Sequence, residues 1–345
     1  MELKKLKLLN FRNHEKFQEN FDKTTILLGA NATGKTSVIE AIYLLSTSKS
    51  FRVVDIGSLI FFDAPFTKIS GQINDENRDL EIDIIIEKEK SLKKTLRIDG
   101  KKQPLVAMLG RFLAVLFTPE TLSIVLGSPS LRRRSLDILL CSISKKYAVN
   151  LLEFLKILRQ RNRLLYLIKE RNASSSGLEA WNKGFVEKSR FLQEKRKALL
   201  LEMNNFLPKS LRLFYYPSPQ EDIEKKLIEN FSREKELGFT LEGPQKDDFV
   251  FNWQGRSLSL FGSRGEIREA TILYKLAEWD FMRQKTGCQP VLLLDDMFSE
   301  LDREKRQKIE ELINKGQTIL TTTSLSLLSP KIIKEAKVIE LRQIL

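Results

Sequence analysis

The segment at residues 28–38, LGANATGKTSV, constrains the fold more than any other part of this chain. Residues 29–36 match the pattern G-x-x-x-x-G-K-[ST] in full, after the strand-like run TTILL and before an apolar helical pattern. Glycines let the backbone curl so that consecutive N–H groups point at phosphate oxygens, and the helix N-terminus adds positive charge. We therefore expect a strand, a loop and a helix that together bind the phosphates of a nucleotide.

The residue types in this loop predict separate roles. Lys35 would neutralise the β- and γ-phosphates, and the hydroxyl of Thr36 would bind Mg²⁺. The candidate nucleotide-binding residues of the loop are Gly29, Asn31, Thr33, Gly34, Lys35, Thr36 and Ser37. The loop predicts nucleotide binding without specifying a reaction class.

A second motif, VLLLDD at residues 291–296, has four apolar residues followed by two carboxylates. A buried parallel strand brings its last side chains to the ligand-binding edge of a sheet. Asp295 is the candidate Mg²⁺ ligand, and Asp296 is placed to orient or deprotonate an attacking water. We expect Asp295, Asp296 and Lys35 to form the catalytic set.

Most of the chain separates these two motifs, and its pattern changes twice. Residues 1–125 are mainly strand-like, with KLKLLNF as an expected edge strand and Asp99-Gly100 as the expected turn of a hairpin. Residues 126–236 show long helical periodicity, which predicts two long antiparallel helices. Residues 237–345 return to an α/β pattern. We expect an α/β head, split in sequence, with an inserted, mainly helical arm domain.

The inserted region is strongly basic. The chain has 345 residues and a net charge of +13, and residues 131–200 hold 17 Lys and Arg against 6 Asp and Glu. Such a helical surface fits sequence-independent binding of a phosphate backbone, with DNA as the expected partner, and the alternative is a solvated helix face. The candidate DNA-binding residues are Lys145, Lys146, Arg159, Arg163, Lys183, Lys188, Arg190, Lys195 and Arg196.

Composition excludes several other classes of function. No window approaches the ~18–20 consecutive apolar residues of a membrane span. A single histidine excludes most histidine-based metal sites and Ser/His catalysis. The two cysteines are far apart, which is typical of buried thiols in a reducing cytoplasm.

A third motif, Ser263-Arg264-Gly265-Glu266, stands between the first two motifs in sequence. With them it resembles the signature S-x-G-[GQE] of the ABC-type ATPase heads of the SMC and RecF class. In that class the signature caps the γ-phosphate held by a second subunit. The resemblance therefore implies an ATP-dependent homodimer in which Ser263, Gly265 and Glu266 contact nucleotide across the interface.

The chain is identified as a member of the RecF family by segments along nearly its whole length. These are LLNFRNHE (8–15), SKSFR (48–52), VLFTPETLSIVLGSPSLRRRSLD (115–137), EGPQKDDF (242–249) and LLLDDMFSELD (292–302). In the family the first segment brings an arginine, here Arg12, to the nucleotide phosphates. Glu266 departs from the family's usual Gln, and Thr322 occupies the place of the switch histidine of transporter ATPases.

The resemblance implies a weak, DNA-stimulated ATPase of recombinational gap repair and replication-fork maintenance in the cytoplasm. ATP would drive a dimer that clamps DNA, and slow hydrolysis would release it. RecR and RecO would act with it to load RecA, with a link to the SOS response. The alternatives are an SMC-like structural head, which needs longer arms, a transporter-type ATPase subunit and a small-molecule P-loop kinase.

Overall fold

The computed structural model describes residues 1–345 apart from 76–77, 90, 172–173, 300–302, 314 and 343–345. The chain forms two compact units: Met1–Thr121 with Glu278–Leu345, and Leu122–Ala277. The expected boundary near residue 125 is close to this division. Residues 237–277, which we assigned to the C-terminal lobe of the head, instead pack within the second unit, because β10 pairs there with β9.

In the described part of the first unit, five parallel strands form a sheet in the order β14-β3-β13-β12-β8. Their bounds, in that order, are Lys337–Glu340, Thr24–Leu28, Thr318–Thr322, Val291–Leu294 and Ala114–Phe117. The inner strands β13 and β12 are buried along their whole length. Apolar runs form such strands because a parallel sheet is covered on both faces. β13 lies between β3 and β12, so the loops after these two strands are close to each other.

Six strands of the described chain form an antiparallel sheet in the order β2-β1-β4-β5-β6-β7. Their bounds, in that order, are His14–Asn20, Glu2–Phe11, Phe66–Asp75, Arg78–Lys88, Leu92–Ile98 and Lys101–Gln103. β1 is not the edge strand that we expected, because it pairs with both β2 and β4. The Asp99-Gly100 turn joins β6 to β7. β5 also pairs with β6, and the connection between those two strands comes earlier in the chain.

Helix α1 (Lys35–Thr47) contacts both sheets and forms the centre of the core of the first unit. Its apolar side chains, including Ile42 and Leu45, pack with side chains of both sheets, such as Leu6 and Leu293. The remaining helices of this unit are α10 (Arg303–Ile313) and α11 (Pro330–Glu335), with single turns at Ile56–Leu59, Leu105–Met108, Pro119–Leu122, Met297–Ser299 and Leu325–Leu327. The helix that carries the phosphate loop is therefore held on both sides.

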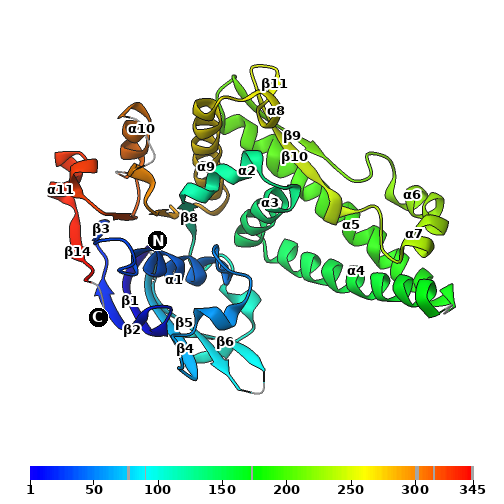
Figure 1. The fold of residues 1–345 in the computed structure, drawn as a ribbon, viewed down its shortest axis with the longest axis horizontal. Coiled ribbons are helices and arrows are strands. Elements are labelled where there is room, and N and C mark those ends of the chain that lie inside the picture. The colour runs from blue at the N-terminus through cyan, green and yellow to red at the C-terminus, as the bar shows by residue number, and fades with distance from the viewer. Residues whose placement is uncertain (76–77, 90, 172–173, 300–302, 314, 343–345) are drawn as a thin grey trace. The chain divides into compact units, whose positions relative to one another are not determined.

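The second unit is built on the long helices α4 (Lys145–Arg171) and α5 (Leu178–Met203), which pack along each other as predicted (Figure 1). The other helices are α2 (Ser123–Leu126), α3 (Pro129–Ile143), α6 (Ile223–Glu229), α7 (Phe231–Leu237) and α8 (Leu258–Phe261). The strands are β9 (Leu211–Tyr216), β10 (Asp248–Trp253) and β11 (Arg256–Ser257). Helix α9 (Arg264–Thr286) begins in this unit and ends in the first. Among the described residues, no helix combines the length and apolar character needed to cross a membrane.

Candidate nucleotide-binding site

The phosphate loop connects the end of β3 at Leu28 to the start of α1 at Lys35. Gly34 has a φ of 91°, and a Cβ atom there would clash with His14 Nε2 and lie 2.6 Å from Asn13 Nδ2. A side chain is therefore excluded at this position by backbone conformation and by space. The His14 ring contacts the Gly34 carbonyl at 3.1 Å, so the β1–β2 turn supports the loop.

Lys35 is buried, and its ammonium group lies inside the curve of the loop. Nζ donates to the Gly29 carbonyl at 2.7 Å and to the Ala30 carbonyl at 2.8 Å. Burial lowers the Lys35 pKa, and the nearby carboxylates of Asp296 and Asp295 oppose this shift. Thr33 stabilises the same loop, because its hydroxyl donates to the Ala30 carbonyl at 2.9 Å. The loop thus holds a cation at the position predicted for phosphate binding.

The phosphate loop and the acidic strand, which are far apart in sequence, meet at Thr36 and Asp295. Asp295 is buried, and its Oδ1 accepts hydrogen bonds from Thr36 Oγ1 at 3.0 Å and from Thr321 Oγ1 at 2.9 Å. Burial raises the Asp295 pKa, whereas these two hydroxyl groups lower it. A hydroxyl beside a carboxylate is a donor set that suits Mg²⁺, which usually takes one or two carboxylates, with waters and phosphates completing its shell.

Asp296 and Thr321 extend the hydrogen-bond network around Asp295. The Asp296 backbone has a φ of 49°, and its N–H donates to Thr321 Oγ1 at 2.8 Å. The Thr321 hydroxyl therefore links the two consecutive acidic residues. Sequence reasoning missed Thr321, although its place at the end of a buried strand next to β12 is a signal that could have identified it.

The phosphate loop borders one cavity of about 490 Å³ in the first unit, and Asp295 lies behind its wall rather than in its lining. It is lined by the predicted residues Arg12, Asn31, Gly34, Lys35, Thr36, Ser37 and Asp296, and also by Asn13, Arg52, Ser58 and Thr321. The cavity carries cationic groups beside backbone N–H groups, which suits a polyanionic ligand. Arg52 was not predicted as a site residue, although it belongs to the SKSFR segment.

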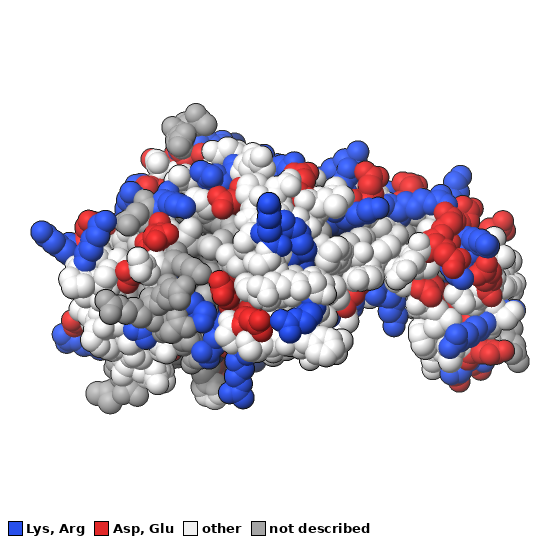
Figure 2. All heavy atoms as spheres, turned by 90° about the horizontal axis from the view of Figure 1, so that it is seen from above, with Lys and Arg blue, Asp and Glu red and all other residues white. Residues whose placement is uncertain are grey.

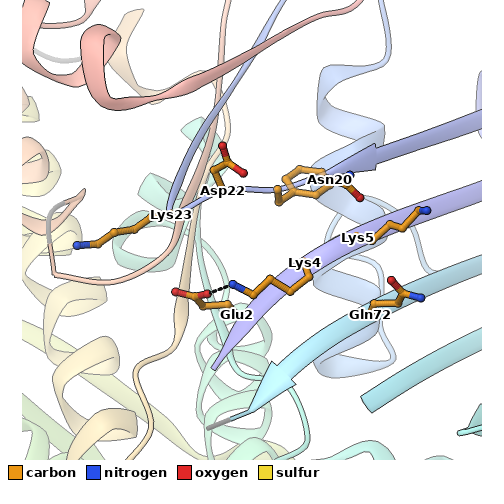
Figure 3. A pocket seen from close by; sticks show the side chains of 8 residues that line it. Glu2, Lys4, Lys5, Asn20, Asp22, Lys23 and Gln72 are labelled. Atoms are coloured by element: carbon orange, nitrogen blue, oxygen red, sulfur yellow. Dashed lines mark hydrogen bonds and ion pairs between the residues drawn. The ribbon is translucent and has the colours of Figure 1, made fainter. Parts of the chain in front are cut away.

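A second hollow, of about 560 Å³, lies at the opposite end of β3 and has different chemistry. Its lysines are accompanied by Glu2 and Asp22, and Lys4 Nζ donates to Glu2. Figure 3 shows Lys5 and Lys23 pointing in different directions rather than converging. This hollow lacks the convergent cations of the phosphate loop, and we assign no ligand to it.

The signature residues lie in the second unit, at the start of α9. Ser263 N–H donates to Glu266 Oε2 at 2.8 Å, and Glu266 N–H donates to Ser263 Oγ at 3.2 Å. This reciprocal pair is a capping box, which gives Glu266 a structural role at its position in the motif. The backbone N–H of Ser263 lowers the Glu266 pKa, with a contribution from the Ser263 side chain. Contact of these residues with nucleotide stays a prediction.

The basic residues of the arm divide into three groups. Lys145, Lys146, Arg159, Arg163 and Lys183 are exposed on α4 and α5. Three others are paired with acids: Lys188 with Glu153 and Glu187, Arg190 with Asp222 and Glu224, and Lys195 with Glu194. Figure 2 shows basic and acidic side chains interspersed on the face in view. Fewer of the basic side chains of the arm are therefore free to contact a partner.

Arg196 is the candidate that the structure contradicts. Only 2% of the residue is exposed, and its guanidinium donates to Asp137, Asp247 and the Pro244 carbonyl. A buried charge needs such partners because leaving water is costly. Arg196 therefore organises the core of the second unit and is not available to a DNA backbone.

The family model described as the RecF/RecN/SMC N-terminal domain matches residues 2–338. The DNA replication and repair protein RecF of Leptospira interrogans is 36% identical over 340 residues, which cover 94% of this chain and 92% of that protein. The solved structure of the recombination mediator protein RecF with ATP, in the RecFOR pathway, has a TM-score of 0.88 at 30% identity, covering 95% of this chain and 93% of that one.

The Smc head domain of Pyrococcus furiosus covers 99% of this chain and 94% of its own, with a TM-score of 0.53 at 17% identity, which shows a shared fold. The prediction of an ABC-type ATPase head with an α/β fold is confirmed by these matches. From the family model and the near full-length identity to its members, the chain belongs to the RecF family of DNA replication and repair proteins.

Proposed function

We propose that this chain is an ATP-dependent DNA-binding ATPase of recombinational gap repair and replication-fork maintenance. The observation that carries the proposal is the 3.0 Å hydrogen bond between Thr36 and Asp295, which unites the phosphate loop with the acidic strand. Similarity to a RecF solved with ATP supports ATP as the nucleotide. The reaction would be hydrolysis of ATP to ADP and phosphate.

Each residue of the site would have its own role in ATP hydrolysis. The loop N–H groups and Lys35 would bind the phosphates, and Arg12 would add a second cation to the same cavity. Mg²⁺, held by Thr36 and Asp295, would neutralise the charge that develops on the phosphates. Asp296 would orient the attacking water and take its proton. Because an aspartate is shorter than the glutamate of transporter ATPases, we expect slow turnover.

A second copy of the chain would complete the site. Ser263 and Gly265 are exposed and Glu266 is partly exposed at the start of a long helix, so a partner's nucleotide could reach them. ATP would therefore drive a homodimer, and hydrolysis would separate it. We propose that the dimer clamps DNA, that DNA stimulates its weak ATPase, and that it acts with RecR and RecO to load RecA during the SOS response in the cytoplasm.

The exposed cations of α4 and α5 support DNA as the partner. No carboxylate lies within ion-pair distance of Lys145, Arg159, Arg163 or Lys183 among the residues that the structure describes. Contacts of this kind bind phosphates without reading sequence and weaken as salt rises. The paired residues Lys188, Arg190 and Lys195 would contribute less.

The first experiment is light scattering with and without ATP in the presence of labelled duplex DNA. We expect the mass of the wild-type protein to double when ATP is added. We also expect the resulting dimer to retain the DNA. Ser263→Arg should bind ATP yet remain a monomer, whereas Ser176→Arg, the same change in the exposed connection between α4 and α5, should dimerise normally. A wild-type protein that binds ATP but stays monomeric at every concentration would contradict the clamp.

A further inference from the structure

Glu40 is a charged residue with no solvent exposure, in the second turn of α1 after the phosphate loop. Its two carboxylate oxygens accept a side-on pair of hydrogen bonds from Arg12, at 2.9 Å from Nε and 2.8 Å from Nη2. The hydroxyl of Ser50 donates to Oε1. A buried carboxylate is strongly destabilising unless it is paired, so Arg12 and Glu40 depend on each other.

Arg12 is held in an unusual backbone conformation. It is the first residue of the two-residue turn between β1 and β2, and its φ is 56°. A turn of this kind favours glycine at a positive φ, so a residue with a long side chain indicates a role for that side chain. Nη1 donates to the Ser58 carbonyl at 3.0 Å. One N–H on each of Nη1 and Nη2 has no partner in the described structure, and Arg12 lines the nucleotide cavity.

The loop after α1 folds around the same carboxylate. Ser50 Oγ, which donates to Glu40, accepts hydrogen bonds from the N–H groups of Arg52 and Val53, each at 3.0 Å. This arrangement brings Arg52 Nη1 to 3.8 Å from Glu40 Oε2. Arg52 also lines the nucleotide cavity. One buried carboxylate therefore holds two arginines at the cavity and leaves a net positive charge there.

We propose that Glu40 is a positioning residue for nucleotide binding. Its carboxylate fixes the guanidinium plane of Arg12 so that the remaining N–H groups can meet phosphate oxygens in a bidentate manner. It also anchors the loop that places Arg52 at the same cavity. The inference rests on the proposed function, because the ligand that the two arginines would receive is the ATP phosphate chain.

The test measures binding of a fluorescent ATP analogue without Mg²⁺, so that no hydrolysis occurs. Glu40→Gln keeps the size of the side chain but removes its charge and turns an N–H₂ group toward Arg12. We expect its Kd to rise about tenfold, or about 1.4 kcal/mol. Arg12→Ala should have a similar effect, and adding Glu40→Gln to it should weaken binding by clearly less than tenfold, because Glu40 acts mainly through Arg12 and otherwise only through the loop that carries Arg52.

Glu234→Gln is the matched control. Glu234 is a buried carboxylate paired with Arg161 at 2.5 Å in the second unit. This control should lower the melting temperature without changing the Kd for ATP. If Glu40→Gln does not fold, Arg12→Lys replaces it, because that variant keeps Glu40 and the charge but loses the planar fork, and it should also bind about tenfold more weakly.

Either of two results for Glu40→Gln would overturn the inference: a folded variant with the wild-type Kd, or an effect on the Kd that adds in full to that of Arg12→Ala. Wild-type affinity of Arg12→Lys would overturn it as well. If the wild-type protein does not bind ATP, the proposed function itself fails. The two failures are therefore distinguishable in one set of titrations.

Discussion

Replacing Thr321 by valine removes one hydroxyl group and leaves the shape of the side chain nearly unchanged. That hydroxyl donates to Asp295 Oδ1 at 2.9 Å and accepts the Asp296 N–H at 2.8 Å. Thr321 is buried and valine fills the same space, so water has no room to take the place of the hydroxyl in either bond. Hydrogen bonds to charged groups contribute about 1.5–3 kcal/mol, and an unsatisfied buried N–H costs about 1–3 kcal/mol, so we expect the free energy of unfolding to fall by about 3 kcal/mol.

The same change should alter the pH dependence of hydrolysis. The Thr321 hydroxyl lowers the pKa of Asp295 and opposes the effect of burial. Without it, the Asp295 pKa rises further, and a higher pH is needed to ionise the carboxylate that would bind Mg²⁺. The acid limb of the ATPase rate against pH should therefore move to higher pH in Thr321→Val.

Thr322→Val is the control for both measurements. Thr322 is equally buried, but its hydroxyl donates to the Ser324 carbonyl at 2.9 Å and does not contact Asp295. We expect a loss of about 1 kcal/mol in urea unfolding and an unchanged acid limb. If the acid limbs of Thr321→Val and wild type superimpose, Thr321 does not tune Asp295 and the reasoning is refuted.

Four further variants test other parts of the structure. Gly34→Ala should abolish ATP binding in a filter assay, because a Cβ atom would clash with His14 and the φ of 91° is strained for alanine. Burial lowers the His14 pKa, so the unfolded chain binds the proton first and stability should fall as the pH drops from about 7 to 5. Thermal melts of His14→Gln should lose this slope, and an unchanged slope would rule out His14 as its source. Arg196→Met should cost about 3–5 kcal/mol in urea unfolding, because it leaves the buried carboxylate of Asp247 and the partly buried one of Asp137 without their ion-pair partner. The DNA affinity of folded Arg196→Met should keep its salt slope, whereas Arg163→Gln with Lys183→Gln should reduce the slope by about two phosphate contacts. If Arg196→Met lowers the salt slope and the double variant does not, Arg196 contacts DNA and the assignment of Arg196 to the core is wrong.

Local patterns explain which parts of the site were predictable. Residues 29–36 bind phosphate through the conformation of consecutive residues, so their spacing alone predicts the loop. The apolar run before Asp295 predicts a buried strand, and a parallel sheet brings the ends of such strands together. The hydrogen bond from Thr36 to Asp295 agrees with that expectation.

The errors and omissions concern pairs of residues that meet only through packing. Arg196 stands in a basic helical run that resembles a solvated face, but Asp137 and Asp247, which bury its charge, come from other elements. Nothing in the sequence distinguishes Glu40 from an ordinary helical glutamate, because Arg12 and Ser50 contact it only in the folded chain. Thr321 becomes a partner of Asp295 only because β13 lies beside β12.

The sequence by itself therefore determined the nucleotide loop, the acidic strand, the split head with its helical arm and the family. Each depends on short-range spacing or on a continuous pattern along the chain. The tertiary structure alone decided which charges are buried and paired, and thus which arginines serve the fold, the nucleotide cavity or the surface. The physical reason is that the state of a charge depends on the partners and the solvent around it, and folding brings those partners from distant parts of the chain.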